Sequence, residues 1–449
     1  MFDLIVLGGG PAGYHGAERA AKAGFSTLLI EKSSLGGVCL NEGCIPSKTL
    51  LYSSKLFAAA KNSSAYGVTA RDVAFDVQTV MTRKRKIIDM HCRGIAGGLK
   101  KCGVAIETGS GLILPKTESF NIAVGEKTFQ GKRLLLCTGS EALRLPVPGA
   151  DQPFVVTNRE ILSIDALPRD LVVVGAGAIG LELAVFFAET GSNVTVVELL
   201  PDIGGSVDKE IGQVLKRELE KANIRFLPQT RVTSFGDHAV NWESPAGTGT
   251  TAADSALMSV GRRSVTQGLG LESIGVTIEK KAIVTDEHGR TNVEGVWAAG
   301  DVNGRSMLAH TAYREADACI DDMLGRKSPV NYDAIAQVIY THPEVAGVGL
   351  TAEEAGIRGF EVLVGKLPLS YNARYGAENE GGRGICKVVV DKQRRRLLGV
   401  HIIGGACSEM IFGAAMMIDR KMTVPEILAQ VFPHPTVSEI IKDAVCQLC

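Results

Sequence analysis

The sequence is short of aromatic residues, and it contains neither a long apolar run nor a basic segment at its start. Phe, Trp and Tyr together make up 5% of the 449 residues. No segment approaches the roughly 18 uninterrupted apolar residues that a membrane-spanning helix requires. The first ten residues, MFDLIVLGGG, contain no lysine or arginine, which argues against a secretory signal or an organellar transit peptide. We therefore expect a cytoplasmic protein without a membrane partner.

An excess of charge of either sign is also missing. The chain holds 48 basic and 49 acidic residues, a formal net charge of −1. This balance argues against nucleic acid as a partner, because binding to a phosphate backbone requires an excess of basic residues. A chain of this length is too long for one hydrophobic core, so two to four domains are expected.

Glycine, in contrast, is abundant, with 52 residues. Glycine allows positive φ angles and a close approach of the backbone to a ligand. Residues 3–7 predict a short strand, and Gly8, Gly10 and Gly13 follow it as GxGxxG. A helix and a second strand, which ends on Glu31, come next. In such a βαβ fingerprint the helix N-terminus faces a pyrophosphate and the acid binds a ribose hydroxyl.

The same arrangement recurs in the middle of the chain. Residues 171–174 predict a strand, GAGAIG supplies Gly175, Gly177 and Gly180, and the strand after the next helix ends on Glu198. In both units the acid lies 23 residues after the first glycine (31 − 8 and 198 − 175). Two fingerprints with equal spacing predict two bound dinucleotides.

The acid of the second fingerprint indicates which nicotinamide cofactor binds. A carboxylate at Glu198 accepts a hydrogen bond from a free 2′-hydroxyl and repels a 2′-phosphate. Residues 199–208 contain no Lys or Arg that could neutralise such a phosphate. NAD is therefore predicted rather than NADP.

A third strand end, in NVEGVWAAGDV, places Gly300 and Asp301 after an apolar run. An acid in this position could serve only as a helix cap. In a protein with two dinucleotides we favour a second role, in which Asp301 binds a ribityl or ribose hydroxyl of the first cofactor. The helix that follows, through His310, is then expected beside the same cofactor.

Two cysteines lie close together in GGVCLNEGCIPSKTL, residues 36–50. A structural disulfide does not suit the reducing cytoplasm. A zinc site would need repeated CxxC pairs or neighbouring histidines, and the sequence offers neither nearby. A redox couple of Cys39 and Cys44 fits better, because a helix that starts at Pro46 places its positive N-terminal end beside Cys44. Lys48, four residues after Cys44, shares its helical face. We predict a working redox couple and no metal.

These motifs together resemble the pyridine nucleotide–disulfide oxidoreductases, and among them most of all the dihydrolipoamide dehydrogenases. The resemblance covers essentially the whole chain. It is carried by both fingerprints and by GGVCLNEGCIPSK, LLLCTGS, SVGRR, AAGDV, MLAH, VIYTHPEVAGVG and FPHPTVSE. The fold class that it implies is α/β, with two Rossmann-like dinucleotide-binding domains and an α+β dimerisation domain at the C-terminal end.

The resemblance also implies how the chain is divided and which cofactors it holds. The first fingerprint is expected to bind FAD and the second NAD. Cys44 is then the thiol against the flavin, and Cys39 is the outer thiol that exchanges with substrate. The expected domains are an FAD-binding domain over 1–145 and 267–333, an NAD-binding domain over 146–266 and a dimerisation domain over 334–449.

Individual cofactor contacts follow from the same resemblance. Lys48 is expected near the flavin and paired with Glu182 of the second fingerprint helix. The residues implied for FAD are Gly8, Gly10, Gly13, Glu31, Lys48, Gly111, Thr138, Gly139, Ser140, Asp301, Met307, Leu308, Ala309 and His310. The residues implied for NAD are Gly175, Gly177, Gly180, Glu182, Glu198, Val232 and Gly261.

His434 and Glu439 lie together in FPHPTVSE near the C-terminus. A lone histidine between prolines is more typical of a loop residue than of a catalyst. Thiol–disulfide exchange, however, needs a base that works near pH 7, and histidine has a suitable intrinsic pKa. Glu439, at the start of an expected helix, can hold one ring nitrogen and stabilise the imidazolium. The resemblance gives these two residues those roles, and it places His434 against the cysteine pair of the other subunit of a homodimer.

The reaction implied by the resemblance is the oxidation of protein-bound dihydrolipoamide to lipoamide, with reduction of NAD⁺. The implied partners are a second copy of the chain and a lipoyl domain or lipoyl carrier protein. That carrier would belong to a 2-oxoacid dehydrogenase, acetoin dehydrogenase or glycine cleavage complex.

Three features depart from the family pattern. The chain ends in CQLC with Cys446 and Cys449, Ser264 stands where the family usually has proline, and no lipoyl-domain extension precedes Met1. The terminal cysteines keep an alternative open, a related flavin reductase of another disulfide or of a metal ion, because such pairs carry electrons outward in mercuric reductases and some thioredoxin reductases. We favour the simpler interpretation that they are incidental cysteines at a chain end. A flavoprotein scaffold without turnover is a third hypothesis, which the paired redox and base motifs argue against.

Overall fold

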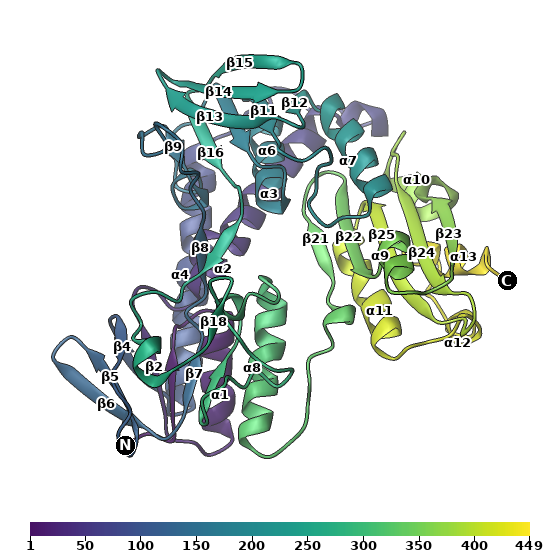
Figure 1. Ribbon diagram of the computed structural model, residues 1–449. Helices are drawn as coiled ribbons and strands as arrows, with labels where there is room; N and C mark the ends of the chain where they lie inside the picture. Colours follow the sequence, from purple (N-terminus) through teal and green to yellow (C-terminus); the bar gives the residue numbers. More distant parts are fainter. The chain divides into compact units, whose positions relative to one another are not determined.

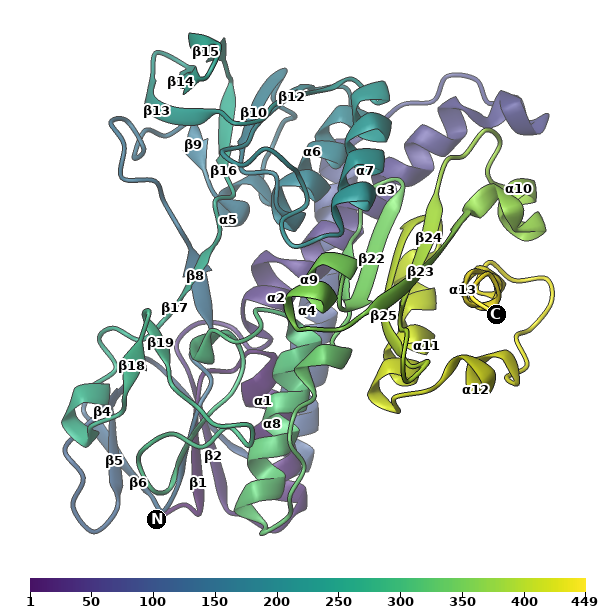
Figure 2. The same ribbon diagram turned by 45° about the vertical axis from the view of Figure 1, so that its right-hand side comes forward.

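The computed structural model describes all 449 residues and divides into two compact units (Figures 1 and 2). None of its helices combines the length and hydrophobicity that crossing a membrane requires. Unit 1 comprises residues 1–49, 79–143 and 261–330, and unit 2 comprises residues 50–78, 144–260 and 331–449.

Unit 1 is built around a parallel five-stranded sheet in the order β20-β7-β1-β2-β3. The central strand β1 (Leu4–Leu7) has all four side chains buried. It pairs with β2 (Thr27–Glu31) on one side and with β7 (Leu134–Leu136) on the other. The edges are β3 (Ala105–Thr108) and β20 (Val296–Ala298). Continuous apolar strands of this kind suit a parallel sheet that is covered on both faces.

Two helices of unit 1, α1 (Pro11–Lys22) and α8 (Ala309–Met323), pack side by side (Figures 1 and 2). Gly16 lets α1 lie close to β7, because a Cβ at this position would be 2.8 Å from the side chain of Leu135, whereas its 3.6 Å distance to the Cβ of Ala316 in α8 would be an ordinary contact. The other elements of unit 1 are α2 (Gly37–Glu42), most of α4 (Val77–Lys101), β4 (Gly111–Ile113), β5 (Phe120–Val124), β6 (Lys127–Gly131), β8 (Ser140–Ala142), β17 (Arg262–Ser264), η2 (Leu271–Ile274), β18 (Ile278–Glu279), β19 (Ala282–Ile283) and η3 (Asp301–Asn303).

Unit 2 contains a second parallel five-stranded sheet, in the order β12-β11-β10-β16-β9. Its β10 (Asp170–Val174), α6 (Ala178–Thr190) and β11 (Asn193–Val197) repeat the β1–α1–β2 arrangement of unit 1. The other elements here are most of α3 (Cys44–Lys61), η1 (Ser63–Tyr66), β9 (Val155–Val156), α5 (Asn158–Ile161), α7 (Lys209–Lys221), β12 (Ile224–Leu227), β16 (Ser255–Met258) and the antiparallel sheet of β13 (Arg231–Gly236), β14 (Ala239–Ser244) and β15 (Gly247–Ala252).

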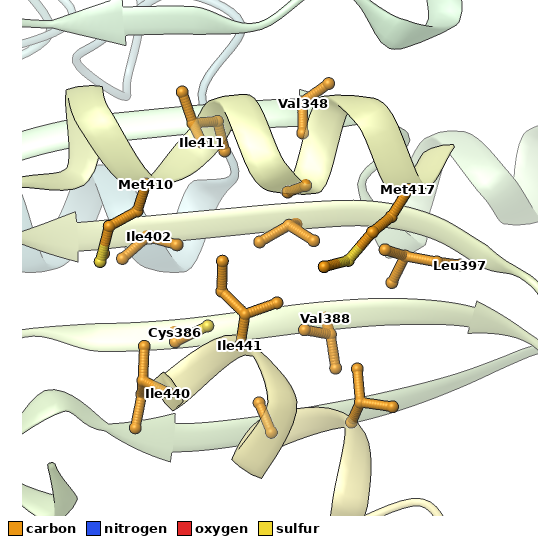
Figure 3. Packing of buried hydrophobic residues seen from close by; sticks show 14 of the residues in the cluster. Val348, Cys386, Val388, Leu397, Ile402, Met410, Ile411, Met417, Ile440 and Ile441 are labelled. Carbon is orange, nitrogen blue, oxygen red and sulfur yellow. The ribbon is translucent and has the colours of Figure 1, made fainter. Parts of the chain in front are cut away.

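The C-terminal part of unit 2 is an antiparallel sheet in the order β21-β22-β25-β24-β23. Side chains from α11 and α13 meet the same face of this sheet, as Figure 3 shows for Met410 and Ile441 around Ile402. The elements are η4 (Tyr332–Ala334), β21 (Gln337–Ile339), β22 (Glu344–Gly349), α9 (Ala352–Ile357), β23 (Val362–Pro368), η5 (Leu369–Tyr371), α10 (Ala373–Glu378), β24 (Ile385–Asp391), β25 (Leu397–Gly404), α11 (Cys407–Asp419), α12 (Val424–Leu428) and α13 (Glu439–Cys446).

The predicted fold class is confirmed: two Rossmann-like parallel sheets are followed by an α+β part at the C-terminal end. The domain boundaries at residues 145, 266 and 333 stay a prediction.

The tightness of the fingerprint turns can be tested by adding a single methyl group. In Gly180→Ala the new Cβ would lie 2.1 Å from the carbonyl oxygen of Gly175 and 2.6 Å from Oγ of Ser259. The turn must then open, at an expected cost of about 1–3 kcal/mol in the free energy of unfolding. Gly98→Ala in α4 is the matched control, because its Cβ meets no atom within 4 Å, and it should stabilise the helix by about 0.5–1 kcal/mol. Thermal unfolding measures both, and a Gly180→Ala protein as stable as its parent would contradict the tight turn.

Candidate active site

Cys39 and Cys44 lie on consecutive helices that are separated only by Gly43. α2 carries Cys39, and α3 begins at Cys44 itself. The sequence predicted a helix that starts at Pro46, which is two residues too late. The helical pattern begins earlier because the N–H of Ser47 donates to the carbonyl oxygen of Gly43 at 3.0 Å. Cys44 therefore lies in the first turn of α3, where the helix dipole favours a thiolate.

The two thiols of this pair are electrostatically unequal. Neither forms a disulfide in this structure, and both are partly exposed. The hydrogen bond between Cys39 and Cys44, followed by burial, raises the pKa of Cys39 above its ordinary value, while the charge of Lys48 acts in the opposite direction. This hydrogen bond therefore favours the protonated form of Cys39.

The first fingerprint has glycines at the positions where a side chain would not fit. Gly8 has a φ angle of +101°, and a Cβ on Gly13 would lie 1.7 Å from the carbonyl oxygen of Gly8. Glu31, at the end of β2, accepts hydrogen bonds from the N–H of Gly9 at 2.6 Å and from the N–H of Ser33 at 2.7 Å. The predicted acid therefore lies directly beside the glycine loop.

The second fingerprint repeats this geometry. Gly175 has a φ angle of +102°, and Gly180 lies against its carbonyl oxygen. Glu198 accepts from the N–H of Ala176 at 2.6 Å and from the N–H of Leu200 at 2.8 Å. The equal spacing in the sequence thus corresponds to equal contacts in the structure.

Both fingerprint helices begin without a side-chain cap. α1 starts after Gly10 and α6 starts after Gly177, and neither has an acidic residue in its first turn. In contrast, the N-terminus of α7 is capped by Asp208, which accepts from two backbone N–H groups. Uncapped N–H groups at the positive end of a helix bind a pyrophosphate. The residues of both fingerprints therefore fit a dinucleotide.

Asp301 lies directly after β20, within a hydrogen-bond network of unit 1. Oγ of Ser140 donates to Oδ2 of Asp301 at 2.5 Å, and Nε of Arg262 donates to Oγ of Ser140 at 2.8 Å. Oγ of Ser264 donates to the main-chain oxygen of Asp301 at 2.6 Å. Ser264, which stands where the family usually has proline, thus makes a side-chain hydrogen bond that proline could not make. Arg262 was missed by sequence reasoning, although the motif SVGRR contains it.

The other residues implied for FAD also lie in unit 1. Thr138 donates through Oγ1 to the main-chain oxygen of Val265 at 2.7 Å. Gly139 has a φ angle of +72°. Gly111 begins β4, and a Cβ there would lie 2.9 Å from Leu7 at the end of β1. Residues 307–310 span the start of α8, which has no side-chain cap and no acid in its first turn.

Among the residues implied for NAD, Glu182 is buried in α6 and accepts from the N–H of Tyr340 at 3.1 Å. Val232 is buried in β13. Gly261 has a φ angle of +111°. The pairing of Glu182 with Lys48 stays a prediction.

His434 and Glu439 are joined as the sequence predicted. Nδ1 of His434 lies 3.0 Å from Oε1 and 3.2 Å from Oε2 of Glu439. The N–H of Thr436 donates to Oε2 at 2.8 Å. That backbone N–H, and then His434, lower the pKa of Glu439 below its ordinary value. The side chain of His434 is 77% exposed, so its other ring nitrogen is open to a group from outside the chain.

The C-terminal cysteines lie on an ordered turn. The N–H of Leu448 donates to Val445 at 3.0 Å, and the N–H of Cys449 donates to Cys446 at 3.2 Å. Arg395 donates to the main-chain oxygen of Leu448 at 2.5 Å. Both thiols are exposed. No group of three or more His, Cys, Asp or Glu side chains in the chain could hold a metal ion.

The fold and the site define a class: proteins that pair two dinucleotide-binding folds with a redox dithiol at a helix N-terminus. Residues 2–316 match the family described as pyridine nucleotide-disulphide oxidoreductase, and residues 335–445 match the dimerisation domain of that family. The chain belongs to this family. It is an NAD-dependent flavoprotein disulfide oxidoreductase with FAD and NAD(H) as cofactors, and its dimerisation domain supports a homodimer.

Individual proteins resemble the chain over nearly its whole length. The mitochondrial dihydrolipoyl dehydrogenase of Pisum sativum is 40% identical over 98% of this chain and 90% of its own length. The structure of LpdA from Mycobacterium tuberculosis has a TM-score of 0.91 at 26% identity and covers 99% of both chains. The HOCl-induced flavoprotein disulfide reductase RclA from Escherichia coli has a TM-score of 0.87 at 26% identity and covers 100% of both.

Proposed function

We propose that the chain oxidises protein-bound dihydrolipoamide to lipoamide and reduces NAD⁺. The observation that carries the chemistry is the pairing of two thiols at the start of α3, where Cys44 lies in the first turn of the helix and the pKa of Cys39 is raised by its hydrogen bond to Cys44. The substrate is proposed because a relative 40% identical over 98% of this chain is a dihydrolipoyl dehydrogenase.

In the proposed exchange, the first substrate thiol loses its proton to solvent, and the resulting thiolate attacks the sulfur of Cys39 in the Cys39–Cys44 disulfide. The bond between the two cysteines breaks, and Cys44 leaves as the thiolate that the N-terminus of α3 stabilises. The second substrate thiol gives its proton to His434 of the partner subunit. It then attacks the substrate sulfur bound to Cys39, which closes lipoamide and releases Cys39. The substrate has lost two electrons and two protons, and the cysteine pair is reduced.

Glu439 supports the base in this scheme. Its carboxylate, which is ionised at neutral pH and has a pKa below the ordinary value, offsets the positive charge that His434 gains with the proton. It also fixes the orientation of the imidazole ring through Nδ1. FAD, when bound, would supply the two-electron chemistry that links oxidation of the dithiol to reduction of NAD⁺.

The cofactor roles in this proposal follow the two fingerprints. The start of α1, Glu31 and Asp301 hold FAD, while the start of α6 and Glu198 hold NAD(H). Lys48 would lie near the flavin. The residues that complete the FAD site are Gly8, Gly10, Gly13, Gly111, Thr138, Gly139, Ser140, Met307, Leu308, Ala309 and His310. Those that complete the NAD site are Gly175, Gly177, Gly180, Glu182, Val232 and Gly261.

The proposed setting is a cytoplasmic homodimer that serves a lipoyl domain or lipoyl carrier protein. The carrier would belong to a 2-oxoacid dehydrogenase, acetoin dehydrogenase or glycine cleavage complex. We retain the domain division of 1–145 with 267–333 for FAD, 146–266 for NAD and 334–449 for dimerisation.

The substrate is tested by mixing the purified protein with dihydrolipoamide and NAD⁺. NADH should form with a turnover number of about 1–10³ s⁻¹. Cys39→Ser should lower this rate by more than about 10³-fold, because no sulfur remains to exchange with the substrate. Cys102→Ser, which removes a partly exposed thiol after α4, is the matched control and should keep the parent rate. The proposed substrate would be contradicted if the protein forms no NADH from dihydrolipoamide and NAD⁺ but oxidises NADH when it is given another disulfide.

The base is tested by two substitutions at the C-terminal end. His434→Gln should lower kcat by about 10²–10⁴-fold, because general-base assistance is lost. Glu439→Gln keeps the shape but removes the charge that supports the imidazolium, and a loss of about 10–100-fold is expected. His342→Gln breaks another histidine–carboxylate pair of unit 2, with Glu189 at 2.7 Å, and should stay within about threefold of the parent. Equal losses in all three proteins would indicate a general structural effect rather than a base.

A second candidate function uses the terminal cysteines as an outward electron carrier, as a mercuric reductase does. Their exposure on an ordered turn is the observation that favours it. If the first proposal holds, Cys446→Ser/Cys449→Ser should oxidise dihydrolipoamide within about twofold of the parent rate, since neither thiol takes part. Loss of this activity with an unchanged melting temperature would support the second function instead.

A further inference from the structure

Along one line of contact between α1 and α8 the side chains that meet are polar. The hydroxyls of Tyr14 and Tyr313 hydrogen-bond each other, and their ring centroids lie 5.9 Å apart at an interplanar angle of 69°. The ring of His15 lies edge-on to Tyr313 at 5.3 Å. Nε2 of His15 lies 2.9 Å from Oδ1 of Asp317, which Arg19 also binds. The ring of Tyr313 is thus held between two residues of α1.

This tyrosine pair is close to the helix that carries Cys39. The start of α2 lies against the start of α1, because a Cβ on Gly37 would be only 2.6 Å from the Cα of Gly10. Cys39 is two residues beyond this contact on α2. Tyr14 is one turn beyond it on α1, and its N–H donates to the carbonyl oxygen of Gly10 at 3.0 Å.

The electrostatics of the phenols agree with this placement. Burial raises the pKa of both Tyr14 and Tyr313 above the ordinary value of a phenol. Negative charge on Cys39 raises both further, and Cys44 acts in the same direction on Tyr313. Glu18, on α1 itself, does so for Tyr14. The phenols therefore remain protonated at neutral pH.

Lys48 completes the set of charged groups that face the thiols, and it lowers the pKa of Cys39. It is a cation from α3, whereas the phenols are neutral donors from α1 and α8.

The tyrosine pair keeps one hydrogen-bond donor unused. Two phenols carry two O–H groups, and the bond between them uses one of these, whichever hydroxyl donates. Neither hydroxyl makes another hydrogen bond within the chain. A partly buried O–H donates most strongly to an anion, so a thiolate nearby is the acceptor that suits it best.

We propose that the Tyr14–Tyr313 pair stabilises and positions the Cys39 thiolate as the mixed disulfide resolves. This inference rests on the exchange at Cys39 described under the proposed function. In that step the second substrate thiolate forms a bond to the substrate sulfur, and the bond from that sulfur to Cys39 breaks. The electron pair stays on Cys39, and the unused O–H donates to it without giving up its proton. The two tyrosines are positioning residues, and His15 with Asp317 holds one of them in place.

The test measures the reactivity of Cys39 in the full-length homodimer with cofactors bound. A Cys44→Ser background leaves Cys39 without its coupled neighbour, so that its titration is read alone. The protein is reduced with dithiothreitol, and alkylation by iodoacetamide is followed from pH 5 to pH 10 by mass spectrometry of the Cys39 peptide. Adding Tyr14→Phe/Tyr313→Phe should move the profile to higher pH and slow alkylation at pH 7 by about tenfold, which corresponds to one pKa unit.

Two controls separate this effect from a general disturbance. Tyr66→Phe removes a phenol hydrogen bond in unit 2, to the main-chain oxygen of Glu378 at 3.2 Å, and should leave the Cys39 profile unchanged. The Cys446 peptide of the same sample should react equally in all proteins. If the double variant does not fold, Tyr313→Phe alone is used, and it should shift the profile in the same direction.

A folded variant whose Cys39 profile coincides with that of the parent would overturn the proposal. In the protein with Cys44 present, Tyr14→Phe/Tyr313→Phe should lower kcat for dihydrolipoamide about tenfold and leave KM within about twofold, because the donor acts on the departing thiolate. Alkylation requires no lipoyl substrate, so a shifted profile without dihydrolipoamide oxidation would reject the proposed substrate and leave the role of the tyrosines standing.

Discussion

The contact between the start of α1 and the start of α2 is the constraint on which the active site depends. The N–H of Gly36 donates to the carbonyl oxygen of Gly9 at 2.8 Å, and Gly37 lies where no Cβ would clear Gly10. The redox helix is therefore fixed to the nucleotide-binding loop. Unit 2 repeats the contact, since the N–H of Gly204 donates to Ala176 at 2.8 Å. There the chain continues into the capped helix α7 and carries no thiol, so one structural repeat has been used for two purposes.

A second feature is that side chains acting together in the site have different electrostatic surroundings. Cys39 and Cys44 are both cysteines, yet Cys39 lies in the short helix α2 with its pKa raised by a hydrogen bond to Cys44, while Cys44 opens the long helix α3. A similar asymmetry separates His434, which is open to the outside, from Glu439, which is held by a backbone N–H. Such differences let residues of ordinary chemistry perform the successive steps of one exchange.

Much of the fold and part of the site could be predicted from the sequence, because they depend on short-range patterns. Glycine spacing and the acid after it determined both fingerprints, and the His434–Glu439 pair followed from a five-residue spacing. The start of α3 at Cys44 was missed, because this turn depends on a backbone hydrogen bond to Gly43, and no residue type in the sequence predicts that bond. The Tyr14–Tyr313 pair joins helices almost 300 residues apart in the chain, and the role of Ser264 depends on its distance to Asp301. Such contacts require the tertiary structure.

The central claim is that dihydrolipoamide reduces the pair formed by Cys39 and Cys44 and that NAD⁺ reverses this reduction. Counting and locating thiols tests it most directly, by anaerobic alkylation of the protein before dihydrolipoamide, after one equivalent of it, and after subsequent NAD⁺. We predict two new thiols, located at Cys39 and Cys44, that appear with dihydrolipoamide and disappear with NAD⁺. New thiols at Cys446 and Cys449 alone, or no change at residues 39 and 44, would contradict the account.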